Sequence, residues 1–486
     1  MRAAGILLPI SSLPGKYGIG TLGEEAYAFI DFLSDAGQTY WQILPLGPTT
    51  YGDSPYQTFS SFACSGLYLD LEYLYKEGLI TKKDLEFQQT SIDFVNYDNL
   101  KVMRLNLYKK ACQKFFKNPP QSYYDFLERE SHWIKGYATF RALKTYYNEK
   151  SFNEWPSDAI KGNLRDDVKQ AISDDVNLHL FIQYMFYTNY EKLKSYAHHK
   201  GIYIIGDLPI YVAYDSSDVW QNPEEFQLDI DLKPTFVAGC PPDSFSEDGQ
   251  LWGNPLYNYQ AMKKNNYAWW MRRLNHSLKL YDVLRIDHFR GFEAYFAIPA
   301  SDKTAKNGHW EKGPGFDIFE QLFKEHKHLK MIMEDLGYLT PEVYRLLSRT
   351  GFPGMRVLEF AFDGRKENAY LPHNYVENTV VYTGTHDNAP LKGWVNTLSV
   401  DQLDQILTYF NLESEDEIPN ALIEAALSSV AQTAIIPLQD YLGLGDESRI
   451  NTPSTVGCNW KWRVNKELLS QDVIEKIKNI TKKYFR

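Results

Sequence analysis

The sequence has little cysteine, and this excludes several common scaffolds. Only four cysteines occur among its 486 residues. No two of them have the C-x-x-C spacing of zinc or redox motifs, and their scarcity does not indicate a disulfide framework. We therefore expect a protein of a reducing compartment, the cytoplasm.

Long apolar runs and an excess of positive charge are also lacking. No run approaches the roughly 20 apolar residues of a membrane-spanning helix, and residues 1–9 look like a first strand rather than a signal peptide. The formal net charge is −11, which argues against nucleic acid or an anionic membrane as the main partner.

Aromatic residues are plentiful, at 15% of the chain with 35 Tyr and 11 Trp. Most of them are expected in the hydrophobic core. An excess of Tyr and Trp in loops would also suit a ligand with apolar faces and many hydroxyls, such as a sugar chain.

Short β-type runs alternate with helix-periodic segments along the chain. Eight runs are predicted as strands, at residues 3–10, 40–46, 202–206, 283–286, 329–333, 355–362, 380–384 and 450–453. This alternation predicts an α/β protein built as a single catalytic (β/α)8 TIM barrel over residues 1–486. Residues 66–175 are predicted to form a mainly helical insertion subdomain between the second and third strands. The proline-rich residues 215–259 are predicted to form an extended active-site loop region.

Four of the predicted strands run directly into an acidic residue. These residues are Asp207, Asp287, Glu334 and Asp387. Because the carboxyl ends of barrel strands form the active-site mouth, the pattern predicts a catalytic cluster there. A purely structural ion pair between Arg285 and Asp287 is the alternative, since such pairs also occur at strand ends.

Two carboxylates are the minimum for glycoside chemistry with retention of configuration. Asp287 suits the nucleophile, because Arg285 lies on the same face of the strand and would keep it ionised. Glu334 suits the acid/base if burial raises its pKa. Asp387 and His386 could contact the hydroxyls of the same sugar ring.

Several motifs together resemble those of one enzyme family. They are GDLPIYV at 206–212, RIDH at 285–288, EDLG at 334–337 and THDN at 385–388, with GILLP at 5–9, GDSPY at 52–56 and NWKWR at 459–463. The first four resemble the signature regions of the α-amylase superfamily. The whole set resembles the 4-α-glucanotransferases known as amylomaltase or disproportionating enzyme, and the likeness spans nearly the whole chain.

The resemblance implies a barrel without a C-terminal β-domain and a reaction that needs no metal or other cofactor. It implies transfer of α-1,4-glucan segments from a maltodextrin donor to the 4-OH of a glucose or glucan acceptor, through a covalent glycosyl-enzyme. Asp287 would be the nucleophile, Glu334 the acid/base and Asp387 the transition-state stabiliser.

The same resemblance implies a set of substrate-binding residues. They are Ser54, Tyr56, Asp207, Phe245, Gln250, Trp252, Arg285, Asp363, His386 and Asn459, with Tyr51 and Tyr97 at a possible second glucan site. The motifs leave two alternatives open. An amylase-type α-1,4-glucan hydrolase would use the same carboxylates, and a non-catalytic glucan-binding barrel would keep the fold.

Overall fold

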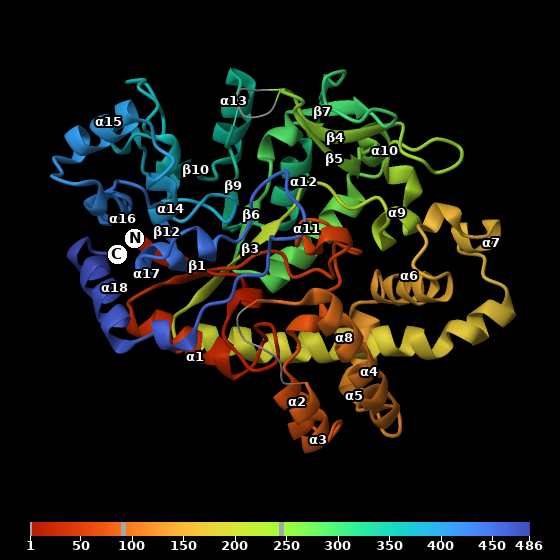
Figure 1. Ribbon diagram of the computed structural model, residues 1–486. Helices are drawn as coiled ribbons and strands as arrows, with labels where there is room; N and C mark the ends of the chain where they lie inside the picture. Colours follow the sequence, from red (N-terminus) through yellow and green to blue (C-terminus); the bar gives the residue numbers. More distant parts are fainter. Residues whose placement is uncertain (1, 89–93, 243–246, 338) are drawn as a thin grey trace.

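Eight parallel strands close into a barrel at the centre of the molecule (Figure 1), and the computed structural model describes residues 2–88, 94–242, 247–337 and 339–486. Around the barrel the order is β1-β12-β11-β10-β9-β6-β3-β2. The strands are β1 Ala3–Leu7, β2 Tyr40–Gln42, β3 Tyr203–Leu208, β6 Val283–Ile286, β9 Met331–Met333, β10 Gly354–Val357, β11 Thr379–Tyr382 and β12 Thr433–Pro437. The closed barrel confirms the predicted fold class.

Helices cover the barrel, so its strands are buried on both faces. All four residues of β6 and of β11 are buried, as parallel strands under a helical layer must be. The α1 helix, for example, packs Phe29 edge-on against Trp41 of β2 at a ring-centroid distance of 5.1 Å. The helices outside the long second-to-third-strand connection are α1 Glu24–Asp35, α9 Ser217–Gln221, α10 Tyr259–Lys264, α11 Ala268–Leu280, α12 Asp317–Glu325, α13 Pro341–Thr350, α14 Leu391–Val395, α15 Val400–Phe410, α16 Ile418–Ser428, α17 Leu438–Leu442 and α18 Gln471–Lys483.

The predicted eighth strand was placed wrongly. Residues 450–453 form a loop, and the last barrel strand is β12, which pairs with β1 and β11. The short run Thr433–Pro437 comes soon after the apolar helix α16, so its composition does not stand out from what precedes it. Strand pairing with both neighbours, rather than local pattern, defines this element.

The connection between β2 and β3 is helical where the structure describes it. Its helices are α2 Leu71–Lys76, α3 Lys82–Phe87, α4 Tyr97–Phe115, α5 Gln121–Arg129, α6 Ile134–Tyr146, α7 Ser157–Ile160 and α8 Asp166–His199. Figure 1 shows the 34-residue α8 running along one side of the barrel, with α4, α5 and α6 beside it. The division of residues 66–175 as a separate subdomain stays a prediction.

Residues 215–259 contain more regular structure than predicted. Within them β4 Phe236–Cys240 pairs with β5 Gln250–Pro255, and two later strands, β7 Ala294–Pro299 and β8 His309–Lys312, complete an antiparallel sheet of order β5-β4-β7-β8. The prolines did not prevent this, because they lie at strand ends or outside the strands. Part of the expected loop is therefore the antiparallel pair β4 and β5, and residues 243–246 lie outside the described part.

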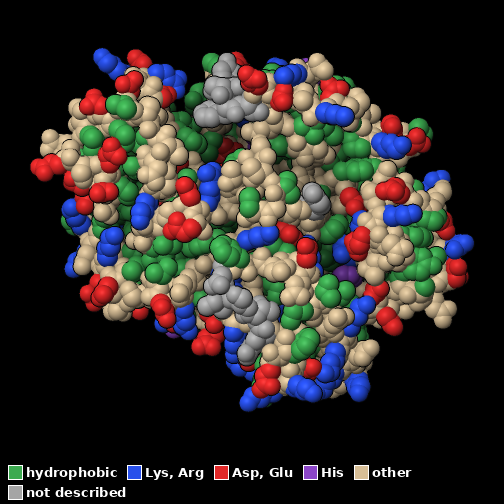
Figure 2. All heavy atoms as spheres, viewed as in Figure 1, with side chains coloured by type: hydrophobic (Ala, Val, Ile, Leu, Met, Phe, Trp, Pro, Cys, Tyr) green, Lys and Arg blue, Asp and Glu red, His purple; other side chains and the backbone are tan. Residues whose placement is uncertain are grey.

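The face drawn in Figure 2 carries charges of both signs. Lys and Arg side chains are interspersed there with Asp and Glu side chains over most of the surface. Within the described ranges no helix is both long enough and apolar enough to cross a membrane.

Gly206 offers a test of how tightly the barrel wall next to Asp207 is packed. A Cβ at this position would lie 2.1 Å from the ring of the buried Tyr281. We expect Gly206→Ala to lower the free energy of unfolding by about 1–3 kcal/mol, as overpacked cores do, measured by urea denaturation. Combining it with Tyr281→Val should recover part of the loss. An unchanged free energy of unfolding for Gly206→Ala would show that the Tyr281 ring moves aside at little cost.

Candidate active site

Three neighbouring strands, β3, β6 and β9, bring Asp207, Asp287 and Glu334 to one rim of the barrel. Asp207 on β3 is in register with Arg285 on β6. Just beyond the strands, the Asp287 amide donates to the Leu208 carbonyl at 3.0 Å, and the Glu334 amide donates to the Ile286 carbonyl at 3.0 Å. The ladder therefore continues past β6 and β9 and fixes where Asp287 and Glu334 begin.

The guanidinium of Arg285 links two of these carboxylates. Its Nη1 donates to both oxygens of Asp207, at 2.8 and 2.7 Å, and to Oδ1 of Asp287 at 3.0 Å. The side chains of Arg285 and Asp207 are almost completely buried, whereas that of Asp287 is 28% exposed. The ion pair considered from the sequence therefore exists, and it lies inside the acidic cluster rather than apart from it.

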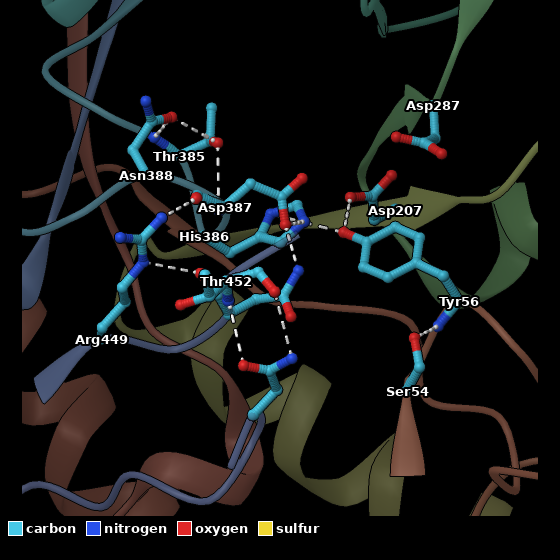
Figure 3. Close-up of polar contacts among 12 residues, drawn as sticks. Ser54, Tyr56, Asp207, Asp287, Thr385, His386, Asp387, Asn388, Arg449 and Thr452 are labelled. Carbon is cyan, nitrogen blue, oxygen red and sulfur yellow. Dashed lines mark hydrogen bonds and ion pairs between the residues drawn. The ribbon is translucent and has the colours of Figure 1, made fainter. Parts of the chain in front are cut away.

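Tyr56 joins this group to the opposite side of the barrel. Its hydroxyl donates to Oδ2 of Asp207 at 2.8 Å and lies 3.4 Å from Nδ1 of His386 (Figure 3). The rings of Tyr56 and His386 are stacked, with centroids 5.0 Å apart. Ser54 holds the loop by accepting a hydrogen bond from the Tyr56 amide at 3.3 Å. The loop after β2 thus contacts both Asp207 on β3 and His386, which follows β11.

The Glu334 carboxylate is held by two backbone donors. One oxygen accepts from the His288 amide at 2.6 Å and the other from the Leu336 amide at 3.0 Å. His288 adopts a left-handed backbone conformation with φ of 50°, which is uncommon for a non-glycine residue and typical of functional sites. Because His288 follows Asp287 directly, this bond ties the two predicted catalytic carboxylates together.

Asp387 is supported by residues that the sequence reasoning missed. Asn451 Nδ2 donates to its Oδ1 at 2.7 Å, and Arg449 Nη2 donates to its backbone carbonyl at 2.9 Å. His386 Nε2 lies 3.3 Å from the same carboxylate oxygen. Because residues 450–453 were predicted as a strand, Asn451 was not expected in a loop that contacts Asp387.

Asn459 braces that loop instead of presenting its amide outward. Its Oδ1 accepts from the Thr452 amide at 3.0 Å, and its Nδ2 donates to the Thr455 carbonyl at 2.9 Å. Only 8% of the residue is exposed. These bonds give Asn459 a positioning role in the loop that carries Asn451, and its direct contact with substrate stays a prediction.

Gln250 and Trp252 lie on β5, next to the residue that follows Asp287. Trp252 Nε1 donates to Oε1 of Gln250 at 3.0 Å, and its ring meets that of His288 edge-on at a centroid distance of 4.9 Å. Phe245, predicted on the same flexible loop as Gln250, lies outside the described residues. The two described side chains form one wall beside the acidic cluster.

Three other predicted binding residues are not brought into this cluster. Asp363 is exposed and its carboxylate pairs with Arg365. Tyr97 is 5% exposed, and its hydroxyl donates to the Trp460 carbonyl at 2.8 Å. The part of Tyr97 in a second glucan site stays a prediction. For Tyr51 the structure describes only the backbone, in the turn Tyr51–Asp53.

Burial and mutual repulsion shape the charge of the cluster. Burial raises the pKa of Asp287 to about 8; Arg285 opposes this rise, and Asp207, Glu334 and Asp387 add to it. Burial also raises the pKa of Glu334, against Arg285 and the two backbone donors. These groups titrate together, so the cluster keeps a proton at neutral pH. One protonated and one ionised carboxyl group side by side are what retaining glycoside chemistry requires.

Comparison with known proteins identifies the family. A family model described as 4-alpha-glucanotransferase matches residues 8–469. The chain belongs to the 4-α-glucanotransferase family. A 4-alpha-glucanotransferase of Clostridium butyricum is 47% identical over 484 residues, which cover 98% of this chain and 99% of that protein. One from Thermus thermophilus is 44% identical, with 95% of each covered.

Solved structures agree with this family assignment. An amylomaltase from Streptococcus agalactiae, determined in complex with acarbose, superimposes with a TM-score of 0.96 at 42% identity, with 100% of both chains covered. An amylomaltase from Corynebacterium glutamicum has a TM-score of 0.81 at 16% identity, covering 99% of this chain and 75% of that one, and shows the shared fold.

The raised pKa of Asp287 makes a prediction about stability. The native state keeps a proton that an unfolded aspartate loses near pH 4, so between about pH 4 and 8 the native state binds more protons. The free energy of unfolding contributed by this group therefore falls as pH rises through that window. We expect Asp287→Asn to have a higher Tm than the natural sequence at pH 8, with the difference shrinking toward pH 4.

The control for this prediction is Asp231→Asn, which changes an exposed aspartate. Its Tm should follow that of the natural sequence across the same pH series. Parallel curves for Asp287→Asn and the natural sequence would contradict the assigned charge behaviour.

Proposed function

We propose that this chain is a retaining transglycosylase that moves α-1,4-glucan segments from a maltodextrin donor to the 4-OH of a glucose or glucan acceptor. The proposal rests on one arrangement. Asp287 contacts Arg285, and the amide of His288, the residue after Asp287, donates to the Glu334 carboxylate. Membership of the 4-α-glucanotransferase family supports the substrate class. We further propose a cytoplasmic location.

In the first step Asp287 attacks the anomeric carbon of the donor. Asp287 and Glu334 titrate together, and the reacting state is the one in which Glu334 holds the proton and Asp287 is ionised. The bond from the anomeric carbon to the glycosidic oxygen breaks as the bond to the aspartate oxygen forms, and Glu334 gives its proton to the departing 4-oxygen. The product is a β-linked glycosyl-enzyme and a shortened glucan. Arg285 contacts the Asp287 oxygen and the buried Asp207, so it holds the attacking carboxylate in place.

In the second step Glu334, now ionised, removes the proton from the acceptor 4-OH. The acceptor oxygen attacks the anomeric carbon, the ester bond to Asp287 breaks, and the α-1,4 linkage is restored. The net configuration is retained, and each carboxyl group returns to its starting state. The two backbone donors on Glu334 keep its oxygens in the same place in both steps.

The remaining polar residues bind the ring that carries the developing charge. Asp387, held by Asn451, and the stacked pair Tyr56 and His386 surround one side of the site, with Asp207 between Tyr56 and Arg285. Negative charge from Asp387 stabilises the oxocarbenium-like transition state. Burial lowers the pKa of His386, so its ring is neutral and bonds to hydroxyls without repelling that cationic centre.

Transfer rather than hydrolysis depends on holding the acceptor. Water is present at about 55 M, but well-oriented groups reach effective molarities of about 10⁵ M or more. We assign acceptor contacts to Gln250 and Trp252 on β5, because the Trp252 ring contacts His288 next to the nucleophile and Gln250 bonds to Trp252. Phe245 is proposed to belong with them.

Loss of the acid/base should depend on the leaving group. We expect Glu334→Gln to lower the rate of transfer from maltodextrin by roughly 10²–10⁴-fold. Glycosylation by α-glucosyl fluoride should be largely kept, because fluoride leaves without a proton. Intact-protein mass spectrometry should then show a trapped glycosyl-enzyme. Glu342→Gln, on exposed α13, is the control, and equal loss with both donors would contradict the assignment.

Incubation with maltotriose alone tests the proposed function. We expect glucose, maltose and a ladder of longer maltodextrins, with a nearly constant number of reducing ends, measured by chromatography and a reducing-sugar assay. A steady rise in reducing ends without longer products would instead show an amylase-type hydrolase. Binding without any product would show a non-catalytic glucan-binding barrel.

A further inference from the structure

A second cluster of polar side chains involves none of the residues assigned to the reaction. Glu130 and His132 occupy the turn between α5 and α6, and His276 lies on the barrel helix α11. One ligand-type atom from each of the three lies within 4.8 Å of the others. The proposed transfer reaction uses none of them, so this group of residues, the Glu130 cluster, needs a separate explanation.

The hydrogen bonds of His276 determine which of its ring nitrogens carries a proton. Nε2 lies 2.9 Å from the Phe62 carbonyl oxygen, which can only accept, so Nε2 is the protonated nitrogen. Tyr187 lies 2.8 Å from the same nitrogen and itself donates to the Phe62 carbonyl at 2.6 Å. In the neutral ring Nδ1 then carries the lone pair, because one imidazole nitrogen donates and the other accepts.

That lone pair faces a carboxylate rather than a donor. Nδ1 of His276 lies 3.7 Å from Oε2 of Glu130, too far for a hydrogen bond. Two ligands each about 2.1 Å from a tetrahedral zinc ion lie about 3.4 Å apart, close to this spacing. Metal-binding histidines usually donate their other ring N–H to a carboxylate, a backbone carbonyl or water, as Nε2 of His276 does to the Phe62 carbonyl.

Glu130 is prepared to act as an anionic ligand. Trp133 Nε1 donates a hydrogen bond of 2.8 Å to its Oε2, which favours the ionised carboxylate. Arg129 donates to the other oxygen, Oε1, at 3.1 Å. Its positive charge weakens cation binding, but it leaves Oε2 as the oxygen that faces His276.

Aromatic rings cover one side of the Glu130 cluster, and solvent reaches the other side. The rings of Phe62, Trp133 and Tyr187 all lie within 6 Å of the His276 ring and shield it. His132 is exposed, so it gives an ion access from solvent. Two imidazoles and one carboxylate form a ligand set that suits zinc among biologically common ions, with the fourth position left to water.

We propose that the Glu130 cluster binds one late first-row divalent ion, zinc in the first place, through His276 Nδ1, Glu130 Oε2 and His132. The ion joins the α5–α6 turn to α11 and so fastens the helical connection to the barrel. It is a structural ion and takes no part in glycosyl transfer.

The test uses the full-length protein after removal of metals with EDTA. Titration with zinc chloride in a calorimeter should show one site per chain, and cobalt(II) should give the visible absorption bands of a tetrahedral site. Zinc at 100 times its Kd should raise the Tm by roughly 3 °C, as expected for a ligand of the native state in a chain of this size.

His132→Gln is the informative variant, because the residue is exposed and its loss should leave the fold intact. We expect this variant to lose the single zinc site and the rise in Tm, while its Tm in EDTA and its maltotriose transfer match the natural sequence. His309→Gln removes an exposed histidine that lies 3.1 Å from Glu311, and it should bind zinc normally. Equal zinc binding by His132→Gln, or no stoichiometric binding by the natural sequence, would overturn the proposal.

Discussion

The buried guanidinium of Arg285 is the contact on which the site depends. It bonds to both oxygens of Asp207 and to Asp287, and it opposes the rise in pKa that burial causes in Asp287 and Glu334. A buried ion pair contributes little to net stability, but removing one partner leaves an uncompensated charge. Geometry and charge at the nucleophile are therefore set by the same side chain, and Tyr56 extends this network through Asp207 to His386.

The barrel explains why residues so distant in sequence meet. Asp207 and Arg285 are partners in the β3–β6 ladder, and backbone hydrogen bonds past the strand ends place Asp287 and Glu334. Loops add what the strands cannot supply, since Tyr56 comes from the β2 connection and Asn451 from the loop after α17. The rigid ladder fixes the reacting carboxylates, while loops surround them.

The acidic residues were predictable because each follows a short apolar run, and the carboxyl ends of parallel strands share one rim. The helical nature of the β2–β3 connection was also visible from its periodicity. The position of β12 was not, because a five-residue strand is defined by pairing with β1 and β11. Nor could the sequence tell that Asn459 turns inward to Thr452 and Thr455, or that Tyr97 is buried against Trp460. Those outcomes depend on how loops pack, which local composition does not encode.

The pairing of β1 with β12 has a consequence for synthesis of the chain on the ribosome. Ala3 lies opposite Thr433, so the first strand waits for a partner made 430 residues later. At about 5–20 residues per second, that wait lasts roughly 20–90 s. During this time one edge of β1 lacks its neighbour, and Asn451, which orients Asp387, is made later still. The nascent barrel is thus an open sheet that chaperones must shield, and it acquires a complete site only when its last strand and the following loop have emerged.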